Sequence, residues 1–209
     1  MKLHDIKLLG GIGLIAGAFG GLIPSIGFLF SLAGIVLVFL AMSELSKITK
    51  DQSIFKNYLI YFILGIVGVF SFAIIFVVSL GFSALVGMMN YSQMMESMRS
   101  VEAILAILKS VLVAAIPLVA LLIIGAVYLK KAYESAAKHT GVQMFATAGL
   151  LYLIAAATYI VLVGFIIAFV AEILAIVAFF SLPEELAEKA EESKTHLKNA
   201  PKRHKGDGQ

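Results

Sequence analysis

The stretch LLGGIGLIAGAFGGLIPSIGFLFSLAGIVLVFLAMS, residues 8–43, carries no charged side chain over 36 residues. As a single helix it would measure about 54 Å, whereas the hydrocarbon core of a bilayer is about 30 Å thick. Pro24 divides the stretch, because proline fits the first turn of a new helix and interrupts an existing one. We therefore expect two membrane spans here, 8–23 and 25–43.

The remainder of the chain has the same apolar character. The 209 residues are 61% hydrophobic and 14% charged, whereas a soluble domain is about 45–50% apolar and about 25% charged. A soluble fold of this size has too little interior to bury so much apolar surface. The composition therefore excludes a cytosolic enzyme, a nucleic-acid-binding domain and a disordered chain. The absence of cysteine excludes disulfides and thiolate metal sites.

The other long apolar stretches predict four further spans, the last two of them separated at Gly164. These spans are 57–80, 104–128, 144–162 and 164–182. With six spans, all of the 16 basic residues except Arg99 and Lys109 lie on the side of the two termini, as the positive-inside rule requires. The sequence therefore predicts an all-α, six-span helical bundle over residues 1–182, in the cell membrane, with both termini cytoplasmic.

The first two spans and the last two spans are expected to form tight hairpins at the two ends of the bundle sequence. Residues 183–209 are polar and follow the last span. Pro183 and the acidic residues after it are typical of the start of a helix. We expect a cytoplasmic helix over 183–199 and a disordered end over 200–209.

Three glycines of the first span recur at every fourth residue: Gly13, Gly17 and Gly21. This doubled GxxxG pattern allows another helix backbone to approach closely, which drives helix association in lipid. The partner is either another helix of the same chain or a second copy in a homo-oligomer. A pore lined by the glycine backbone is the alternative interpretation.

Glu172 lies midway along the last predicted span, where an ionisable group costs at least ~2.5 kcal/mol to insert. Such a group must be paired, protonated, or turned toward protein or water. Lys109 lies in the fourth predicted span. Both spans begin on the outer side of the membrane, and Lys109 lies at a depth from that side similar to the depth of Glu172. We therefore predict an intramembrane Glu172–Lys109 pair. In the alternative, Lys109 extends to the outer headgroups, and a protonated Glu172 is satisfied by a neighbouring backbone.

Pro117 interrupts the fourth predicted span and is expected to kink it, as a hinge or as a determinant of packing. The chain contains no HExxH, GxSxG or phosphate-binding Gly-Lys-Ser/Thr motif, and no pair of carboxylates within one span. The four histidines are scattered without metal-ligand spacing. We therefore expect no catalytic residues, no cofactor, no metal site and no enzymatic activity.

Four short motifs resemble those of one archaeal and bacterial membrane family, the domain of unknown function 996. They are LLGGIG at 8–13, KDQSIF at 50–55, GVQMF at 141–145 and AFFSLP at 178–183. The resemblance implies an uncharacterised integral membrane protein. It implies no activity and no catalytic residues.

Two functions fit these patterns. The first is a non-enzymatic membrane protein that packs or interacts through its Gly-rich helix, with the lipid bilayer and a second copy as its partners. The alternative is a small transporter or channel that uses the intramembrane Glu172. The sequence identifies neither a substrate nor an ion.

Overall fold

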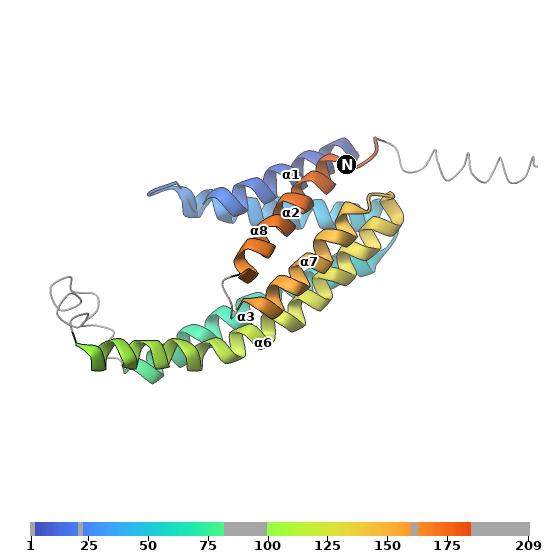
Figure 1. The fold of residues 1–209 in the computed structure, drawn as a ribbon. Coiled ribbons are helices and arrows are strands. Elements are labelled where there is room, and N and C mark those ends of the chain that lie inside the picture. The colour runs from blue at the N-terminus through green and yellow to red at the C-terminus, as the bar shows by residue number, and fades with distance from the viewer. Residues whose placement is uncertain (1–2, 21–22, 82–99, 160–162, 185–209) are drawn as a thin grey trace, which may run out of the picture.

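The computed structural model describes residues 3–20, 23–81, 100–159 and 163–184, and every regular element among them is an α-helix (Figure 1). The predicted all-α class is therefore confirmed for these residues. The helices are α1 (Leu3–Gly20), α2 (Gly27–Ile48), α3 (Gln52–Leu80), α6 (Val101–Thr140), α7 (Met144–Thr158) and α8 (Val163–Phe180). The expected polar tail lies outside the described residues beyond residue 184.

Five of these helices, α1, α2, α3, α6 and α8, are long and apolar enough to cross a membrane. The sixth, α7, is apolar but has 15 residues, a rise of about 22 Å. Residues 160–162 of its predicted span lie outside the described part of the chain. The apolar helical bundle is thus confirmed, whereas the number of crossings stays a prediction.

The connections at the two polar junctions are shorter than the loops 44–56 and 129–143 that the sequence suggested. α2 continues to Ile48, and α6 continues to Thr140. Local chemistry explains where they stop. Gly141 takes the left-handed conformation (φ 76°) and donates its N–H to Ala137, which closes α6. The helices therefore extend past the apolar segments that define the predicted spans.

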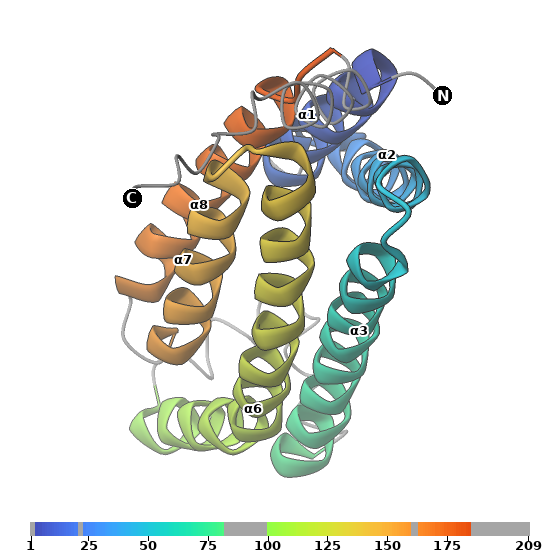
Figure 2. The ribbon, with the colours of Figure 1, turned by 90° about the vertical axis from the view of Figure 1, so that its right-hand side faces the viewer.

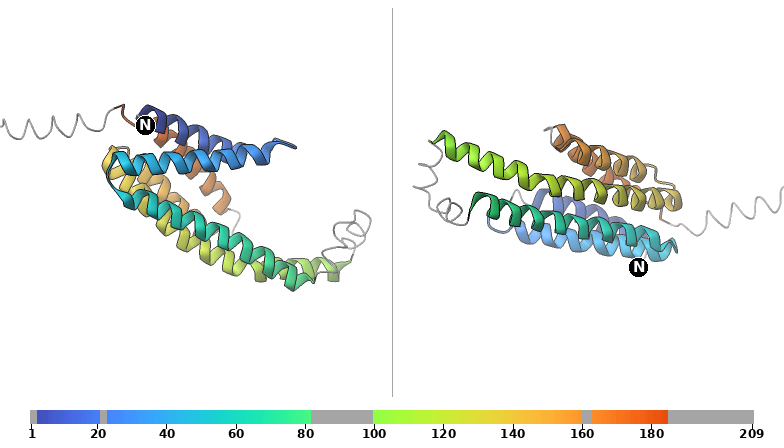
Figure 3. Two further views of the ribbon diagram at one scale, coloured as in Figure 1. Left: turned by 180° about the vertical axis from the view of Figure 1, so that it is seen from behind. Right: turned by 90° about the horizontal axis from the view of Figure 1, so that it is seen from below.

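The main helix–helix contacts form a closed circuit, in which α1 packs on α2 and α8, α7 packs on α8 and α6, and α3 packs on α6 and α2. The helices converge at the end that holds the α2–α3 and α6–α7 connections, and α1 and α2 diverge from α3 and α6 away from it (Figures 1 and 3). The largest fully buried side chains are Tyr133, Phe145, Phe179, Ile6, Met42, Leu45, Ile54, Leu129 and Leu182.

Large hydrophobic side chains cover the outer surface of the helices. Phe28 is 72% exposed, Val78 is 76% exposed and Ile116 is 70% exposed. A soluble monomer rarely exposes a contiguous apolar surface of this extent. The exposed side chains therefore match a bundle that is surrounded by lipid.

Glycines bring α1 and α2 into backbone contact. A Cβ atom added at Gly34 of α2 would overlap the backbone at Gly13 and Gly17 of α1. A Cβ at Gly13 would lie 2.9 Å from Leu37 Cβ, whereas one at Gly17 would meet no atom within 4 Å. The structure thus gives the glycines of α1 a partner within the chain. Gly21 lies outside the described residues.

The longest helix, α6, has 40 residues and a length of about 60 Å, twice the thickness of the hydrocarbon core. It remains one helix through Pro117, and it bends strongly along its length (Figure 2). Proline cannot donate to the carbonyl four residues earlier, which is that of Val113, and its ring crowds that carbonyl. A kink at Pro117 accounts for a bend in this helix, while its role as a hinge stays a prediction.

Candidate functional site

The polar centre of the bundle is Glu172 on α8, which lies beside α7. Ala171 and Ala175 on α8 and Ala155 on α7 are fully buried, and such small side chains allow helices to approach closely. The Tyr152 hydroxyl of α7 donates a hydrogen bond to Glu172 Oε2. The carboxyl group therefore has a neutral phenol as its partner.

Further tyrosines lie on α6 and α3. The ring of Tyr152 lies 6.2 Å from that of Tyr133 on α6, and Tyr58 and Tyr61 on α3 are 6.0 Å apart. Tyr58 and Tyr133 are buried in the core. Helices α3, α6 and α7 thus each carry a tyrosine of this group, and Tyr152 contacts the carboxyl group on α8. We call Glu172, Tyr152, Tyr133, Tyr58 and Tyr61 the carboxyl–tyrosine cluster.

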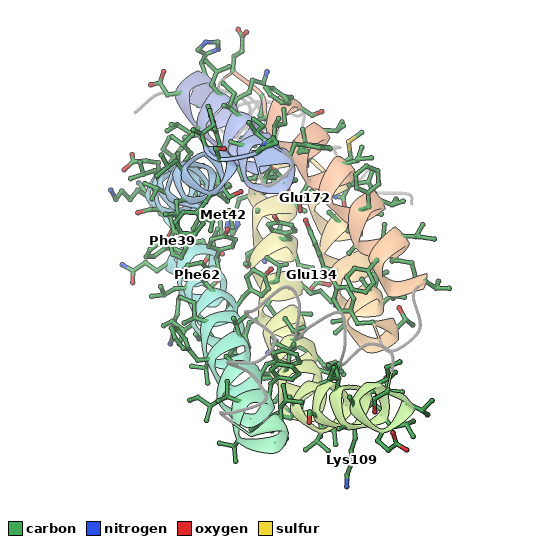
Figure 4. The ribbon with its side chains drawn as sticks, turned by 90° about the vertical axis from the view of Figure 1, so that its left-hand side faces the viewer. Phe39, Met42, Phe62, Lys109, Glu134 and Glu172 are labelled. Carbon is green, nitrogen blue, oxygen red and sulfur yellow. The ribbon has the colours of Figure 1, made fainter. Side chains whose placement is uncertain are left out.

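The structure does not bring Lys109 and Glu172 together. Lys109 is exposed, and it points away from the bundle on the amino-terminal arm of α6, far from Glu172 (Figure 4). The prediction matched the depths of the two residues by assuming that both helices begin at one level. Because α6 is long and bent and packs mainly on α3 and α7, it carries Lys109 away from α8.

Tyr152 is the site residue that the sequence analysis missed, although the sequence contained a signal for it. Tyr152 lies midway along the predicted span 144–162, and Glu172 lies midway along the predicted span 164–182. Residues midway along two adjacent antiparallel spans lie at a similar depth. This shared depth would have paired them.

A second polar cluster joins the α2–α3 connection to the carboxyl-terminal end of α6. Asp51 caps α3 by accepting from Ser53 N at 2.9 Å. Ser53 Oγ lies 3.1 Å from Ser135 Oγ. His139 Nδ1 lies 2.8 Å from the Ser135 carbonyl oxygen and 3.6 Å from Asp51 Oδ2. These contacts tie α3 to α6 at the converging end of the bundle.

The hydrogen bond from Ser53 holds the pKa of the Asp51 carboxyl below its usual range, and the His139 charge acts in the same direction. A carboxyl whose pKa is lower in the folded chain stabilises the fold above its unfolded pKa of about 3.9. That stabilisation is lost as the pH falls through the lower, folded pKa.

Replacing the cap should therefore have a measurable, pH-dependent effect. We expect Asp51→Ala to lower the free energy of unfolding by about 1 kcal/mol near neutral pH, because it leaves an N–H of α3 without a partner. Asp51→Asn keeps a capping oxygen that does not titrate, so its stability should fall less than that of the wild type under acid conditions. Thermal unfolding in detergent, followed by circular dichroism from neutral to acid pH, tests both. Equal acid sensitivity of the two proteins would contradict this role of Asp51.

Among the described residues, no group of three or more His, Asp or Glu side chains is placed to hold a metal ion. The described residues thus form an apolar helical bundle that contains the carboxyl–tyrosine cluster. Its long apolar helices are consistent with an integral membrane protein.

Comparison with known proteins places the chain in a family. A family described as a protein of unknown function, DUF996, matches residues 30–173, which include most of α2, all of α3, α6 and α7, and Glu172. An uncharacterized protein of Methanocaldococcus jannaschii is 38% identical over 190 residues, which cover 89% of this chain and 96% of that protein. No solved structure matches the chain. The chain belongs to the DUF996 family, as its short motifs predicted.

Proposed function

We propose that this protein is a non-enzymatic multi-pass protein of the cell membrane that belongs to the transporter or channel class, and that Glu172 binds and releases a proton or a small cation. The hydrogen bond between Tyr152 and Glu172, made across the α7–α8 contact, carries the proposal. It identifies a carboxyl group that points into the bundle rather than toward lipid.

The charge balance of the cluster supports this function. An ionised carboxylate within a membrane is costly, and intramembrane carboxyls therefore mark ion and proton pathways by default. Lys109, the basic residue of the fourth predicted span, points away and does not neutralise Glu172 (Figure 4). A phenol donates a hydrogen bond without supplying a charge. A proton or a cation would balance the carboxylate.

The second candidate function is packing or interaction through the Gly-rich helix, without transport. The contacts of α1 favour it, because Gly10 and Gly11 lie against Phe179 and Phe180 of α8, and Gly13 lies against α2. A Cβ atom added at Gly17 would meet no atom within 4 Å, so the direction of that Cβ leaves room for the helix of a second copy. In this function Glu172 would be a closed hydrogen-bonded contact with no path to water.

Water access to Glu172 distinguishes the two functions. The wild-type chain has no cysteine, so single cysteines can be placed without further changes. In cells or oriented vesicles, a membrane-impermeant thiol reagent applied from outside should modify Ser25→Cys and Val163→Cys in the predicted outer connections. We expect Glu172→Cys to be modified as well, because the reagent reaches only thiols in contact with water.

Ile173→Cys is the matched control, since Ile173 follows Glu172 on α8 and is 42% exposed on the lipid-facing surface. It should stay unmodified. If Glu172→Cys also stays unmodified while Ser25→Cys and Val163→Cys react, the carboxyl has no outer aqueous path and the packing function is favoured. Failure of Ser25→Cys and Val163→Cys to react would contradict the six-span topology.

A further inference from the structure

A long apolar groove lies between α2 and α3 on the surface of the bundle. It has a volume of about 540 Å³ and is lined mainly by Phe39, Leu40 and Ser43 of α2 and by Phe55, Phe62 and Ile63 of α3. Phe39 and Phe62 meet edge to face, with ring centroids 4.6 Å apart (Figure 4). Binding sites for small molecules occupy about 300–1,000 Å³. We call this feature the α2–α3 groove.

The length of the groove matches one leaflet of a bilayer. Its lining on α2 runs from Ile35 to Ser43, a rise of about 12 Å along the helix, whereas half of the hydrocarbon core is about 15 Å. The Ser43 end lies near the α2–α3 connection, and the Ile35 end lies toward the bilayer centre. The shape and the apolar lining therefore suit a hydrocarbon chain that lies parallel to the helices.

The end of the groove at the connection carries three lysines, Lys47, Lys50 and Lys56, and two acidic residues, Glu44 and Asp51. Lys47 follows Ser43 by one helical turn, and Lys56 precedes the lining residue Leu59 by one turn. Lys50 lies in the connection between them. Lys47 pairs with Glu44 at 2.6 Å, whereas Lys50 and Lys56 are exposed and take part in none of the ion pairs between described residues. Two cations thus remain available at the level of lipid headgroups.

We propose that the α2–α3 groove binds an anionic phospholipid of the surrounding leaflet, with one acyl chain against Phe39 and Phe62 and the phosphate beside Lys50 and Lys56. The apolar groove selects the hydrocarbon chain and the lysines select the negative headgroup. The groove lining does not include Glu172 or Tyr152, although Phe39 packs on Tyr58 with ring centroids 5.2 Å apart. Lipid binding at the groove is measured without any transport assay, so its failure is distinguishable from failure of the proposed function.

The absence of tryptophan makes the site accessible to a fluorescence experiment. A single tryptophan is introduced by Ile63→Trp in the groove, and the full chain is reconstituted in phosphatidylcholine vesicles that contain brominated lipid, which quenches tryptophan on contact. Brominated phosphatidylglycerol is compared with brominated phosphatidylcholine. Because each basic residue near an anionic lipid surface contributes about 1 kcal/mol, we expect phosphatidylglycerol to bind at least about five-fold more tightly at this position.

Val170→Trp is the matched control, since Val170 is 44% exposed on α8 and lies outside the groove. It should show no preference between the two lipids. Lys50→Ala combined with Lys56→Ala should abolish the preference at Ile63→Trp while circular dichroism and gel filtration remain unchanged. An equal preference at both tryptophans, or a preference that survives loss of both lysines, would overturn the proposal. Shielding of the Ile63→Trp fluorophore from both lipids would identify a second copy of the chain as the occupant and would also overturn it.

Discussion

Replacing Glu172 with glutamine is expected to reduce proton flux through reconstituted vesicles to the level of vesicles without protein. Glutamine keeps the size of the side chain and can still accept from the Tyr152 hydroxyl, but it neither binds nor releases a proton. The flux is measured with a pH-sensitive dye inside vesicles that contain the purified full chain, after a potassium diffusion potential is imposed. A sodium-sensitive dye under the same conditions tests the cation form of the proposal.

Two further variants make this result specific. Tyr152→Phe removes the hydroxyl that contacts Glu172, and hydrogen bonds to charged groups contribute ~1.5–3 kcal/mol, so we expect an intermediate loss of roughly ten-fold. Glu134→Gln is the control, because Glu134 on α6 pairs with Lys130 at 2.6 Å and its side chain is 46% exposed. Its flux should equal that of the wild type. Transport at this site would be refuted if Glu172→Gln showed the full wild-type flux of protons and sodium. It would also be refuted if vesicles with the wild-type chain were no more permeable to either ion than vesicles without protein.

The second large effect is expected at the α1–α2 contact. Gly34→Ala places a methyl group where the backbone of α1 already lies, and backbone cannot move aside as a flexible side chain can. Overpacking costs about 1–3 kcal/mol, and we expect Gly34→Ala to reach the upper part of that range. Gly34→Leu should prevent the hairpin from closing. Unfolding of the purified protein in detergent, followed by circular dichroism, measures the loss.

Gly65→Ala is the matched control for this prediction. Gly65 also lies inside a helix, α3, but an added Cβ there meets no atom within 4 Å. Alanine has a higher helix propensity than glycine by about 1 kcal/mol, so Gly65→Ala should be neutral or stabilising. Gly17→Ala should behave in the same way, although the sequence motif includes Gly17. Equal melting temperatures for Gly34→Ala and Gly65→Ala would contradict the close approach of α1 and α2.

Local features of the sequence predicted the elements of this fold. Long apolar stretches identified the helices. The ends at the polar junctions were less predictable, because α2 and α6 continue beyond their apolar segments. The apolar composition of a segment indicates how far it lies in the hydrocarbon core, whereas backbone hydrogen bonding and capping decide at which residue the helix ends.

The sequence by itself determined that this chain forms apolar helices, because hydropathy and backbone propensity act over a few neighbouring residues. It also singled out Glu172, since a carboxyl in an apolar stretch stands out without any structure. Only the tertiary structure decided that Tyr152, rather than Lys109, is the partner of Glu172. That choice depends on which helices are neighbours and on the bend of α6. These properties arise from packing between segments far apart in the chain.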